Sequence, residues 1–392
     1  MSKELVAGID IGTYHVKVVI ARRDEDGSPV VIGSGIAESK GVRHGYITHP
    51  HEISEGITHA WKSACEQAGE RPKHVFVGIG GIGLGSIVIS STTIISRADS
   101  EITSLDIENL HNQCEKDIPI AATQNRKIIH SVPLQYKIDG KVILGSPIGM
   151  KSTKLEVKML FITCLEHHIN DVMDAVQSAG IRVTDVMASP IAASLVTLTQ
   201  PQKIAGCVLA NIGAETVSIA VFENSIPVSL EVFPIGSTDI TNDIALGLKV
   251  PLEDAEHIKI GELIGSNIPR KKLDEIVSAR LSDIFDLIEA HLKKIGRSGL
   301  LPAGIIITGG GSHITSIEDM AKAALRLPSR KGSIIVNPGD KSQFKDSSWA
   351  VAYGLCVFGY HADEKGGSVS NGHRIIAQTK NNLFSWIKQF LP

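Results

Sequence analysis

The chain contains 392 residues, of which 43% are hydrophobic and 21% are charged, and its formal net charge is −3. This length exceeds the roughly 250–300 residues at which one hydrophobic core stops growing, so we expect at least two domains. The nearly balanced charge predicts no nucleic-acid partner, and no apolar run approaches the ~20 residues that span a bilayer. The five cysteines are scattered without a C-x-x-C pair, which favours reduced thiols in a cytosolic protein over disulfides or zinc.

The N-terminal part of the chain predicts a hairpin, a third strand, a helix and a fourth strand. The hairpin pairs the β-branched runs Leu5–Ile9 and Val16–Ala21. Pro29–Ser34 is expected as the third strand, residues 50–69 as a helix and His74–Ile79 as the next strand.

Between residues 82 and 158 the pattern changes to alternating β-runs around one helix. The expected strands are Ile87–Ile95, Arg126–Tyr136 and Lys141–Leu144, and the expected helix is Ser104–Asp117. Such alternation is typical of antiparallel strands, so this segment predicts an inserted α+β subdomain.

The rest of the chain alternates between strands and helices. A strand at Val157–Thr163 leads into a helix that ends near Gly180, and a further helix covers Ile191–Leu198. The second half then predicts a hairpin from Leu209 to Val221, a strand at Ile226–Ile235, helices across 238–297, a buried strand at Ile305–Thr308, a helix at 317–325, a strand at Ser333–Val336 and a core helix at Ser347–Tyr360. The alternation predicts an α/β fold.

Two segments about 200 residues apart read as copies of one device. In Gly8–Thr13 and again in Leu209–Ala214, an apolar β-run ends in a glycine-containing corner that a second β-branched run follows. Glycine lets backbone N–H groups approach an anion closely, and successive N–H groups form a concave anion site. Two such corners predict a duplicated fold that holds a triphosphate between its halves.

The first corner carries the residues that suit a phosphate–metal complex. Asp10 is expected to bind Mg²⁺, usually through water, while Thr13 offers a hydroxyl and Lys17 a positive charge. An ordinary Asp-x-Gly hairpin turn is the alternative interpretation. Gly309–Ser312 follows the strand Ile305–Thr308, where ligands bind in α/β sheets; it predicts a surface for a nucleoside, and a merely permissive loop is the alternative.

The C-terminal residues 380–392 predict an amphipathic helix that follows a Gly/Ser/Asn-rich linker, residues 363–379. Its apolar side chains fall within an arc of about 160° and are Leu383, Phe384, Trp386, Ile387, Phe390 and Leu391. Lysine on the opposite side favours a lipid interface; a partner groove and docking on the protein's own core are the alternatives. Since one short helix binds weakly, stable attachment requires several tails on one assembly.

The order of these motifs resembles the actin/Hsp70/sugar-kinase superfold, and within it the FtsA family of bacterial cell-division proteins. The segments that carry the family resemblance are Ile9–Thr13, Val77–Gly81, Pro147–Met150, Leu155–Lys158 and Asp254–Lys259. The resemblance implies an α/β, actin-like (ribonuclease H-like) duplicated fold, with two lobes around a nucleotide cleft and an inserted α+β subdomain in place of the usual actin subdomain.

The resemblance also implies a division into subdomains. They would be a first core subdomain of residues 1–81, 159–200 and 341–362, the insertion 82–158, a second core subdomain of 201–242 and 300–340, a helix-rich subdomain 243–299 that binds FtsZ, the linker 363–379 and the terminal helix 380–392.

ATP and Mg²⁺ are the implied cofactors. The implied site consists of Asp10, Gly12, Thr13, Tyr14 and Lys17, then Asn211, Gly213, Ala214, Glu215 and Thr216 around the phosphates, Glu256 and Lys259 at the ribose or base, and Gly309, Gly310, Gly311 and Ser312 under the adenosine. Asn211 stands where most of the superfold has a second aspartate, and Ser189 where Hsp70-like members have a glutamate. No residue is confidently catalytic, so we expect ATP binding with slow or negligible hydrolysis.

The implied function is that of a polymerising adaptor that tethers the tubulin-like FtsZ ring to the cytoplasmic face of the membrane at the division site. Its partners would be the FtsZ C-terminal peptide, further copies of itself, anionic membrane lipid and other division proteins. One alternative is a PilM-type pilus-assembly adaptor, which would bind a membrane protein's peptide and need no lipid anchor of its own. Another is a sugar-kinase-branch ATPase, which would need a catalytic aspartate that the sequence does not offer.

Overall fold

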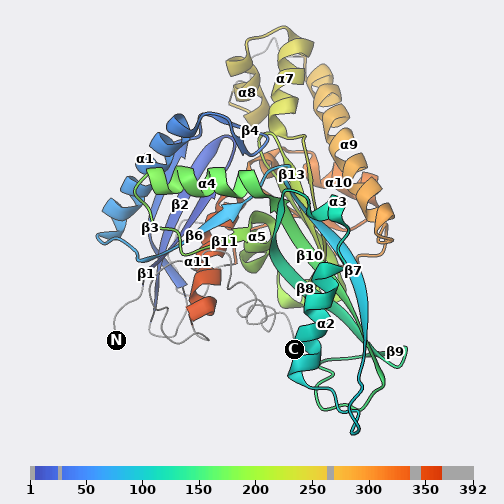
Figure 1. Cartoon of the computed structure of the whole chain (residues 1–392). Coiled ribbons are helices and arrows are strands. Elements are labelled where there is room, and N and C mark those ends of the chain that lie inside the picture. The colour runs from blue at the N-terminus through green and yellow to red at the C-terminus, as the bar shows by residue number, and fades with distance from the viewer. Residues whose placement is uncertain (1–4, 25–28, 263–268, 336–345, 364–392) are drawn as a thin grey trace.

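The computed structural model describes residues 5–24, 29–262, 269–335 and 346–363, and it consists of two lobes and an inserted subdomain (Figure 1). The first lobe holds a five-stranded sheet in the order β11-β6-β1-β2-β3, and the second lobe one in the order β16-β15-β12-β13-β14. The first sheet comprises β1 (Leu5–Ile11), β2 (His15–Arg23), β3 (Pro29–Glu38), β6 (His74–Ile79) and β11 (Asp185–Ala188). The second comprises β12 (Cys207–Ile212), β13 (Val217–Glu223), β14 (Ile226–Phe233), β15 (Ile305–Thr308) and β16 (Ser329–Lys331).

The second sheet repeats the topology of the first. In each, the first three strands pair antiparallel and the last two add in parallel. The two corners repeat as well, because the Gly12 N–H donates to the His15 carbonyl at 3.1 Å and the Gly213 N–H to the Thr216 carbonyl at 2.8 Å. The expected duplicated α/β fold is therefore confirmed.

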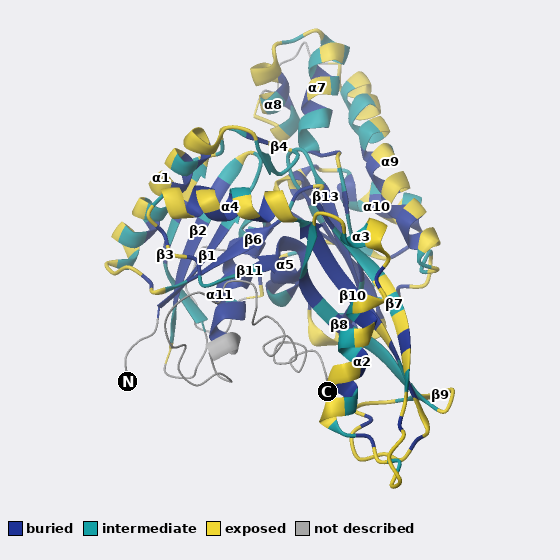
Figure 2. Ribbon diagram, in the orientation of Figure 1, coloured by how far each residue is buried: buried dark blue, intermediate teal, exposed yellow. Residues whose placement is uncertain are grey.

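Helices cover both faces of each sheet. The helical segments are α1 (Pro50–Ala68), α4 (Glu166–Ser178), α5 (Ser189–Thr197), α6 (Gln200–Ala205), α7 (Ser237–Leu248), α8 (Leu252–Ile260), α9 (Arg270–Lys294), α10 (Ile317–Leu325) and α11 (Ala350–Asp363), with short 3₁₀ turns η1 (Gly310–His313) and η2 (Ser347–Trp349). Helix α1 starts on a proline, stops at Gly69 in the left-handed conformation, and buries Ile53 and Ile57 on one face, as its sequence pattern predicts. Buried residues concentrate in the strands and exposed ones on the outer faces of α1 and α9 (Figure 2).

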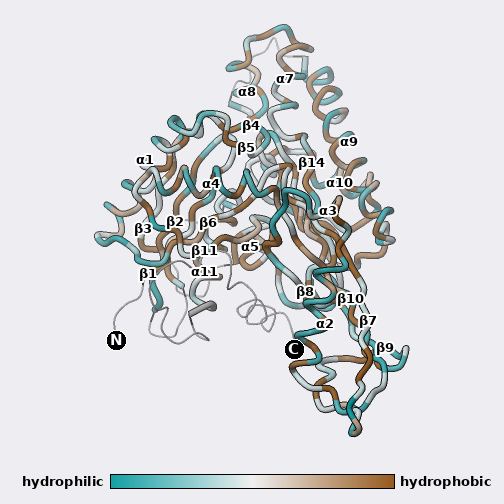
Figure 3. Tube along the Cα trace, viewed as in Figure 1, coloured by the Kyte–Doolittle hydropathy of each residue, from teal (hydrophilic) through white to brown (hydrophobic). Residues whose placement is uncertain are grey.

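Successive side chains of β12 point to opposite faces of its sheet, so this strand contributes to the cores of both lobes. Cys207 and Leu209 pack into the core of the first lobe, whereas Val208 and Ala210 pack under the helices of the second. Helix α5 is buried between α11 and the strands β12 and β13. Its residues are apolar or small, and the hydroxyls of Ser194 and Thr197 donate to backbone carbonyls of the same helix. The hydropathy of the chain shows the same pattern, with apolar residues gathered in the strands between the lobes (Figure 3). The lobes therefore share one hydrophobic seam below the cleft.

The insertion is an antiparallel sheet, as expected, with two helices where the sequence predicted one. Its strands are β7 (Leu84–Ile94), β8 (Arg126–Ile138), β9 (Lys141–Ile143) and β10 (Lys154–Leu165), and its helices are α2 (Ser104–Lys116) and α3 (Ile120–Thr123). One face of β10 packs under α2 through Phe161, and the other packs into the first lobe through Leu160. The Ser86 hydroxyl also bonds the N–H and the carbonyl of Leu230 in β14, both at 2.8 Å. The insertion therefore contacts both lobes.

One expected strand is wrong. The sequence predicts a strand at Ser333–Val336, but the strand is β16, and residues 333–335 pair with no strand. Gly332 still donates to the Ile307 carbonyl, and the chain then leaves the sheet so that the Ile335 N–H donates to Val196 in the first lobe at 2.7 Å. The β-branched run thus forms a crossing between lobes, which a pattern of residue types does not distinguish from a strand.

The C-terminal expectations fall outside the described residues. The linker 363–379 starts on the last residue of α11, and the remainder of it and the terminal helix 380–392 are not described. In the described part of the chain, the helices are too short or too polar to span a membrane.

Where α11 crosses α5, the backbones are so close that adding a methyl group should destabilise the fold. A Cβ on Gly354 would lie 2.0 Å from the Ala192 carbonyl oxygen, so Gly354→Ala should lower the free energy of unfolding by about 1–3 kcal/mol or more. A Cβ on Gly85 would meet nothing closer than 3.7 Å, and Gly85→Ala serves as the control. Chemical denaturation of both variants tests this packing; equal stability would contradict it.

Candidate functional site

Most of the expected site residues line one cleft between the lobes, with a volume of about 430 Å³. The first lobe contributes Asp10, Gly12, Thr13, Tyr14 and Lys17, and the second contributes Asn211, Gly213, Ala214, Thr216, Glu256, Lys259, Gly309 and Gly310. Residues separated by up to 300 positions in the sequence therefore face the same space, between the two hairpin corners.

Three expected residues do not line this cleft. Gly311 and Ser312 are buried behind the loop, where the Ser312 hydroxyl donates to the Gly309 carbonyl at 2.7 Å. Glu215 turns toward the first lobe, and its carboxylate accepts a hydrogen bond from the His44 N–H at 2.7 Å. The Glu215 side chain therefore connects the lobes instead of lining the cleft.

The charges of the first corner lie on adjacent strands. Asp10 in β1 stands opposite Lys17 in β2. Burial raises the pKa of Asp10 to about 6, although the nearby Lys17 ammonium partly offsets this. Burial also lowers the pKa of Lys17, whose Nζ donates to the Ser348 carbonyl at 2.8 Å and lies 5.3 Å from the centre of the Trp349 ring. Desolvation thus makes Asp10 a carboxylate that a cation would stabilise.

The loop after β15 provides a surface free of side chains. Gly309 has φ +85°, and a Cβ there would lie 2.3 Å from the Asn211 Oδ1, so only glycine fits. A Cβ on Gly310 would meet nothing within 4 Å, because that residue faces the open cleft. A flat group can therefore rest directly on the backbone at this position.

A polar network on α7 and α8 forms the opposite wall. Glu256 Oε2 accepts hydrogen bonds from the Thr241 hydroxyl at 2.6 Å and from Lys259 Nζ at 2.7 Å. Lys259 also donates to Thr241 Oγ1 at 2.9 Å, and its side chain is only 8% exposed. The network holds a cation and a carboxylate in fixed positions at the cleft, where hydroxyl groups of a sugar can exchange hydrogen bonds with both.

The sequence interpretation missed the start of α7 and the segment before α11. Ser237 and Thr238 line the cleft, and their N–H groups donate to the carbonyls of Gly213 and Ala214 at 2.9 and 2.8 Å. The Ser-Thr-Asp sequence that follows Gly236 and begins α7 is the signal that could have identified this side of the cleft. Asp346, Ser347, Ser348 and Trp349 line the cleft as well; the sequence analysis assigned the last three only to a core helix and gave Asp346 no role.

The donor set limits how a metal ion can be held. Among the described residues, no three His, Cys, Asp or Glu side chains are placed to hold a metal together. Asp10 is a desolvated carboxylate at the floor of the cleft, and hard cations such as Mg²⁺ usually take one or two carboxylates plus water and phosphate. The residues present therefore fit a hydrated magnesium ion that a phosphate brings with it, rather than a metal bound by protein alone.

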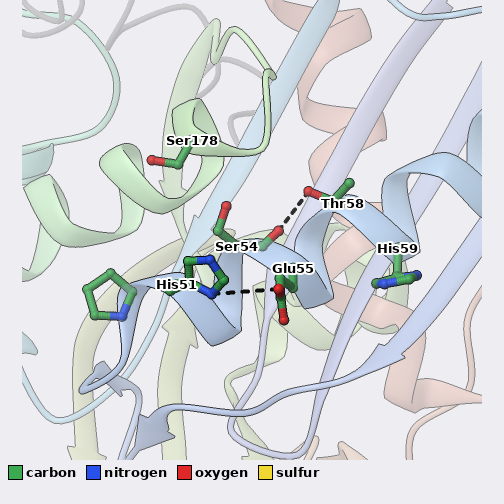
Figure 4. A pocket seen from close by; sticks show the side chains of 7 residues that line it. His51, Ser54, Glu55, Thr58, His59 and Ser178 are labelled. Atoms are coloured by element: carbon green, nitrogen blue, oxygen red, sulfur yellow. Dashed lines mark hydrogen bonds and ion pairs between the residues drawn. The ribbon is translucent and has the colours of Figure 1, made fainter.

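A second hollow lies on the outer face of the first lobe and contains no expected site residue. It is lined by Pro50, His51, Ser54, Glu55, Thr58 and His59 of α1 and by Ser178 of α4 (Figure 4). His51 and Glu55 pair at 3.6 Å one turn apart, and the Thr58 hydroxyl donates to the Ser54 carbonyl at 2.8 Å. These are ordinary contacts of an exposed helix. The His59 side chain points away from His51 and Glu55 (Figure 4).

Comparison with protein families identifies two segments. The family model described as "Cell division protein FtsA" matches residues 208–354, and the one described as "SHS2 domain inserted in FTSA" matches residues 86–163. The FtsA of Pseudomonas aeruginosa is 29% identical over 390 residues, covering 94% of this chain and 92% of that protein. The FtsA of Bacillus subtilis is 28% identical over 346 residues, covering 83% of this chain and 78% of that protein.

Solved structures show the same fold at lower sequence identity. The PilM-PilN type IV pilus biogenesis complex aligns with a TM-score of 0.66 and 17% identity, covering 91% of this chain and 98% of that chain. MreB5 of Spiroplasma citri bound to ADP aligns with a TM-score of 0.52 and 13% identity, covering 93% and 99%. The actin-like fold is confirmed, and one of its members binds a nucleotide.

The pKa of Asp10 gives a prediction about pH. A raised pKa in the folded state means that folding stability decreases as the pH rises from about 4 through 6, as the buried carboxyl ionises. Asp10→Asn has no carboxyl to ionise and avoids this loss. Without nucleotide, its free energy of unfolding should therefore exceed that of the wild type by about 1–3 kcal/mol at pH 7.5 and match it near pH 4. Thermal melts across this range test the sign; a variant less stable at pH 7.5 would contradict it.

Proposed function

Because this chain belongs to the FtsA family of cell division proteins, we propose that it is an ATP-binding, actin-like adaptor. In this proposal the protein polymerises and tethers a ring of FtsZ to the cytoplasmic face of the membrane at the division site. The observation that carries the proposal is the cleft between two repeated corners, lined from both lobes, in a chain of this family.

The nucleotide would lie across the cleft with its phosphates between the corners. Backbone N–H groups and hydroxyls around Gly12–Thr13 and Gly213–Thr216 would face the phosphates, with Lys17 supplying positive charge. The Glu256–Lys259 pair would bind the ribose, and Gly309–Gly310 would underlie the adenosine. Magnesium would neutralise phosphate charge beside Asp10 when bound.

The cleft favours binding over turnover. Of its lining residues, the carboxylates are Asp10, Glu256 and Asp346. Glu256 is engaged by Lys259 and Thr241, and Asp346 accepts hydrogen bonds from Ser348. Asp10 would face the metal, so no carboxylate is left to activate a water molecule, and we propose that hydrolysis is slow or negligible.

The partners in this proposal attach to separate surfaces. The helix-rich subdomain 243–299 would bind the FtsZ C-terminal peptide, which exposed apolar side chains on α7 and α8 support, since Leu246 is 78% exposed and Leu252 59%. The insertion would serve contacts between protomers and with other division proteins. The amphipathic segment 380–392 would bind anionic lipid, and the apolar and basic residues of its sequence support this.

The alternatives share parts of this account. A PilM-type adaptor has the same fold, but both family models and the named curated relatives carry the FtsA name. A sugar-kinase ATPase would need a free catalytic carboxylate in the cleft, and the cleft residues offer none in the described structure.

Membrane attachment is tested by co-sedimentation with vesicles that contain anionic lipid, in the presence of ATP, Mg²⁺ and FtsZ. We expect the wild type to pellet with the vesicles and to carry FtsZ, whereas Trp386→Glu and the chain shortened to residues 1–379 should stay in the supernatant, because the apolar face is lost. Ser385→Glu adds the same charge on the polar face and should still pellet. Equal pelleting of all forms would remove the anchor from the proposal.

Turnover is tested by phosphate release from the purified protein with ATP and Mg²⁺. We expect ATP to bind with little phosphate released, because no free carboxylate orients water. Rapid multiple-turnover hydrolysis without partners would contradict the adaptor and favour an enzyme.

A further inference from the structure

Glu215 is the residue of the second corner that turns away from the cleft. Gly213, Ala214 and Thr216 all line the cleft, while the Glu215 side chain, 12% exposed, reaches the first lobe. Its Oε2 accepts from the His44 N–H at 2.7 Å, and its Oε1 lies 3.3 Å from Arg43 Nε. The Glu215 carbonyl lies 3.1 Å from His44 Nδ1, which must donate because a carbonyl only accepts. One residue thus makes three contacts across the cleft.

The first-lobe side of this bridge is a rigid hairpin. Strands β4 (Val42–Arg43) and β5 (Tyr46–Ile47) are joined by a two-residue turn in which His44 and Gly45 both have positive φ, +49° and +84°. This is the geometry of a tight hairpin loop.

The hairpin is fixed to the first lobe in turn. The Ile82 N–H donates to the His44 carbonyl at 3.2 Å, the Gly45 backbone packs against Gly81, and the Tyr46 ring stacks on His167. In Figure 1 the β4 label lies where the first lobe meets the second, close to β13. The His44 N–H therefore points across the cleft from a position that the first lobe determines.

The second-lobe side is equally fixed. The carbonyls of Gly213 and Ala214 accept hydrogen bonds from the first N–H groups of α7, and a Cβ on Gly236 would lie 2.2 Å from the Ala214 carbonyl oxygen. The corner that would hold phosphates thus moves with α7 as one body. The Glu215 side chain is the flexible part of the connection between two rigid elements.

We propose that Glu215 is a positioning residue whose bridge to Arg43 and His44 holds the cleft closed at its phosphate end and sets how long a nucleotide stays bound. This inference rests on the proposed nucleotide function. Gly45 and Gly81 on one side and Gly213 and Ala214 on the other line the same cleft, so separating the lobes there breaks all three contacts at once.

The two partners contribute unequally. The bond from the His44 N–H to a largely buried carboxylate is short and charge-assisted, so its loss carries most of the effect. Arg43 is 70% exposed, and water screens its pairing with the carboxylate. Removing Glu215 should therefore open the cleft far more than removing Arg43.

The test is the release rate of a fluorescent ATP analogue, chased with excess ATP in the presence of Mg²⁺. Glu215→Ala should speed release about 10-fold, Glu215→Gln less, because its amide oxygen still accepts from His44, and Arg43→Ala about 2-fold. Lys40→Ala is the matched control, since among the described residues Lys40 pairs with the exposed Glu38 of its own lobe at 3.7 Å. The release rate of this variant should equal the wild type's.

A double variant separates the bridge from a general loosening of the corner. In a Glu215→Ala background, Arg43→Ala should add no further acceleration, because Arg43 lies in the other lobe and acts only through the lost carboxylate. Independent effects of the two substitutions would overturn the bridge. If Glu215→Ala does not fold, as judged by circular dichroism, the single variants Glu215→Gln and Arg43→Ala still test the bridge, because both should release nucleotide faster than Lys40→Ala.

A failure of the proposed nucleotide function can be told apart from a failure of the Glu215 inference. A wild type that binds no nucleotide would overturn the proposed function and this inference together. A wild type that binds, with Glu215 variants that release at the wild-type rate, would overturn this inference alone.

Discussion

Two equivalent backbone corners, which face each other across the cleft, are the constraint on which the rest of the structure depends. Each corner is closed by a single hydrogen bond, from Gly12 to His15 and from Gly213 to Thr216. The sheets that carry them both contact the buried helix α5, so the two lobes are joined through a common hydrophobic core. A ligand that touches both corners would therefore contact both lobes at once.

The electrostatics of the cleft support the proposal that it binds a nucleotide with little turnover. Burial raises the pKa of Asp10 to about 6, and a bound cation would recover the cost of keeping its carboxylate charged. The position matching Asp10 in the second copy is Asn211, which cannot add a second charge. Glu215 bonds to the opposite lobe instead of a ligand. In the proposed function, Asp10 would then face the metal and Glu215 would hold the lobes together.

Local sequence signals predicted the parts of the site that depend on backbone type. Glycines at the two corners and at Gly309 mark places where a side chain would crowd the neighbouring backbone or side chain, and β-branched runs mark most of the strands. The orientation of Glu215, the crossing at residues 333–335 and the cleft wall at Ser237 depend on where another lobe lies. No pattern within a short window encodes that position, so these features became visible only in the folded chain.

Isothermal titration calorimetry with ATP and Mg²⁺ tests the central claim, that the mirrored corners enclose a nucleotide, most directly. The account predicts one site per chain in the wild type. It also predicts much weaker binding when Lys17→Ala and Lys259→Ala remove the cations from the two lobes, while a surface change such as Lys40→Ala leaves the affinity unchanged. A wild-type protein that gives no binding heat at several temperatures, or that binds equally well without both lysines, would contradict it.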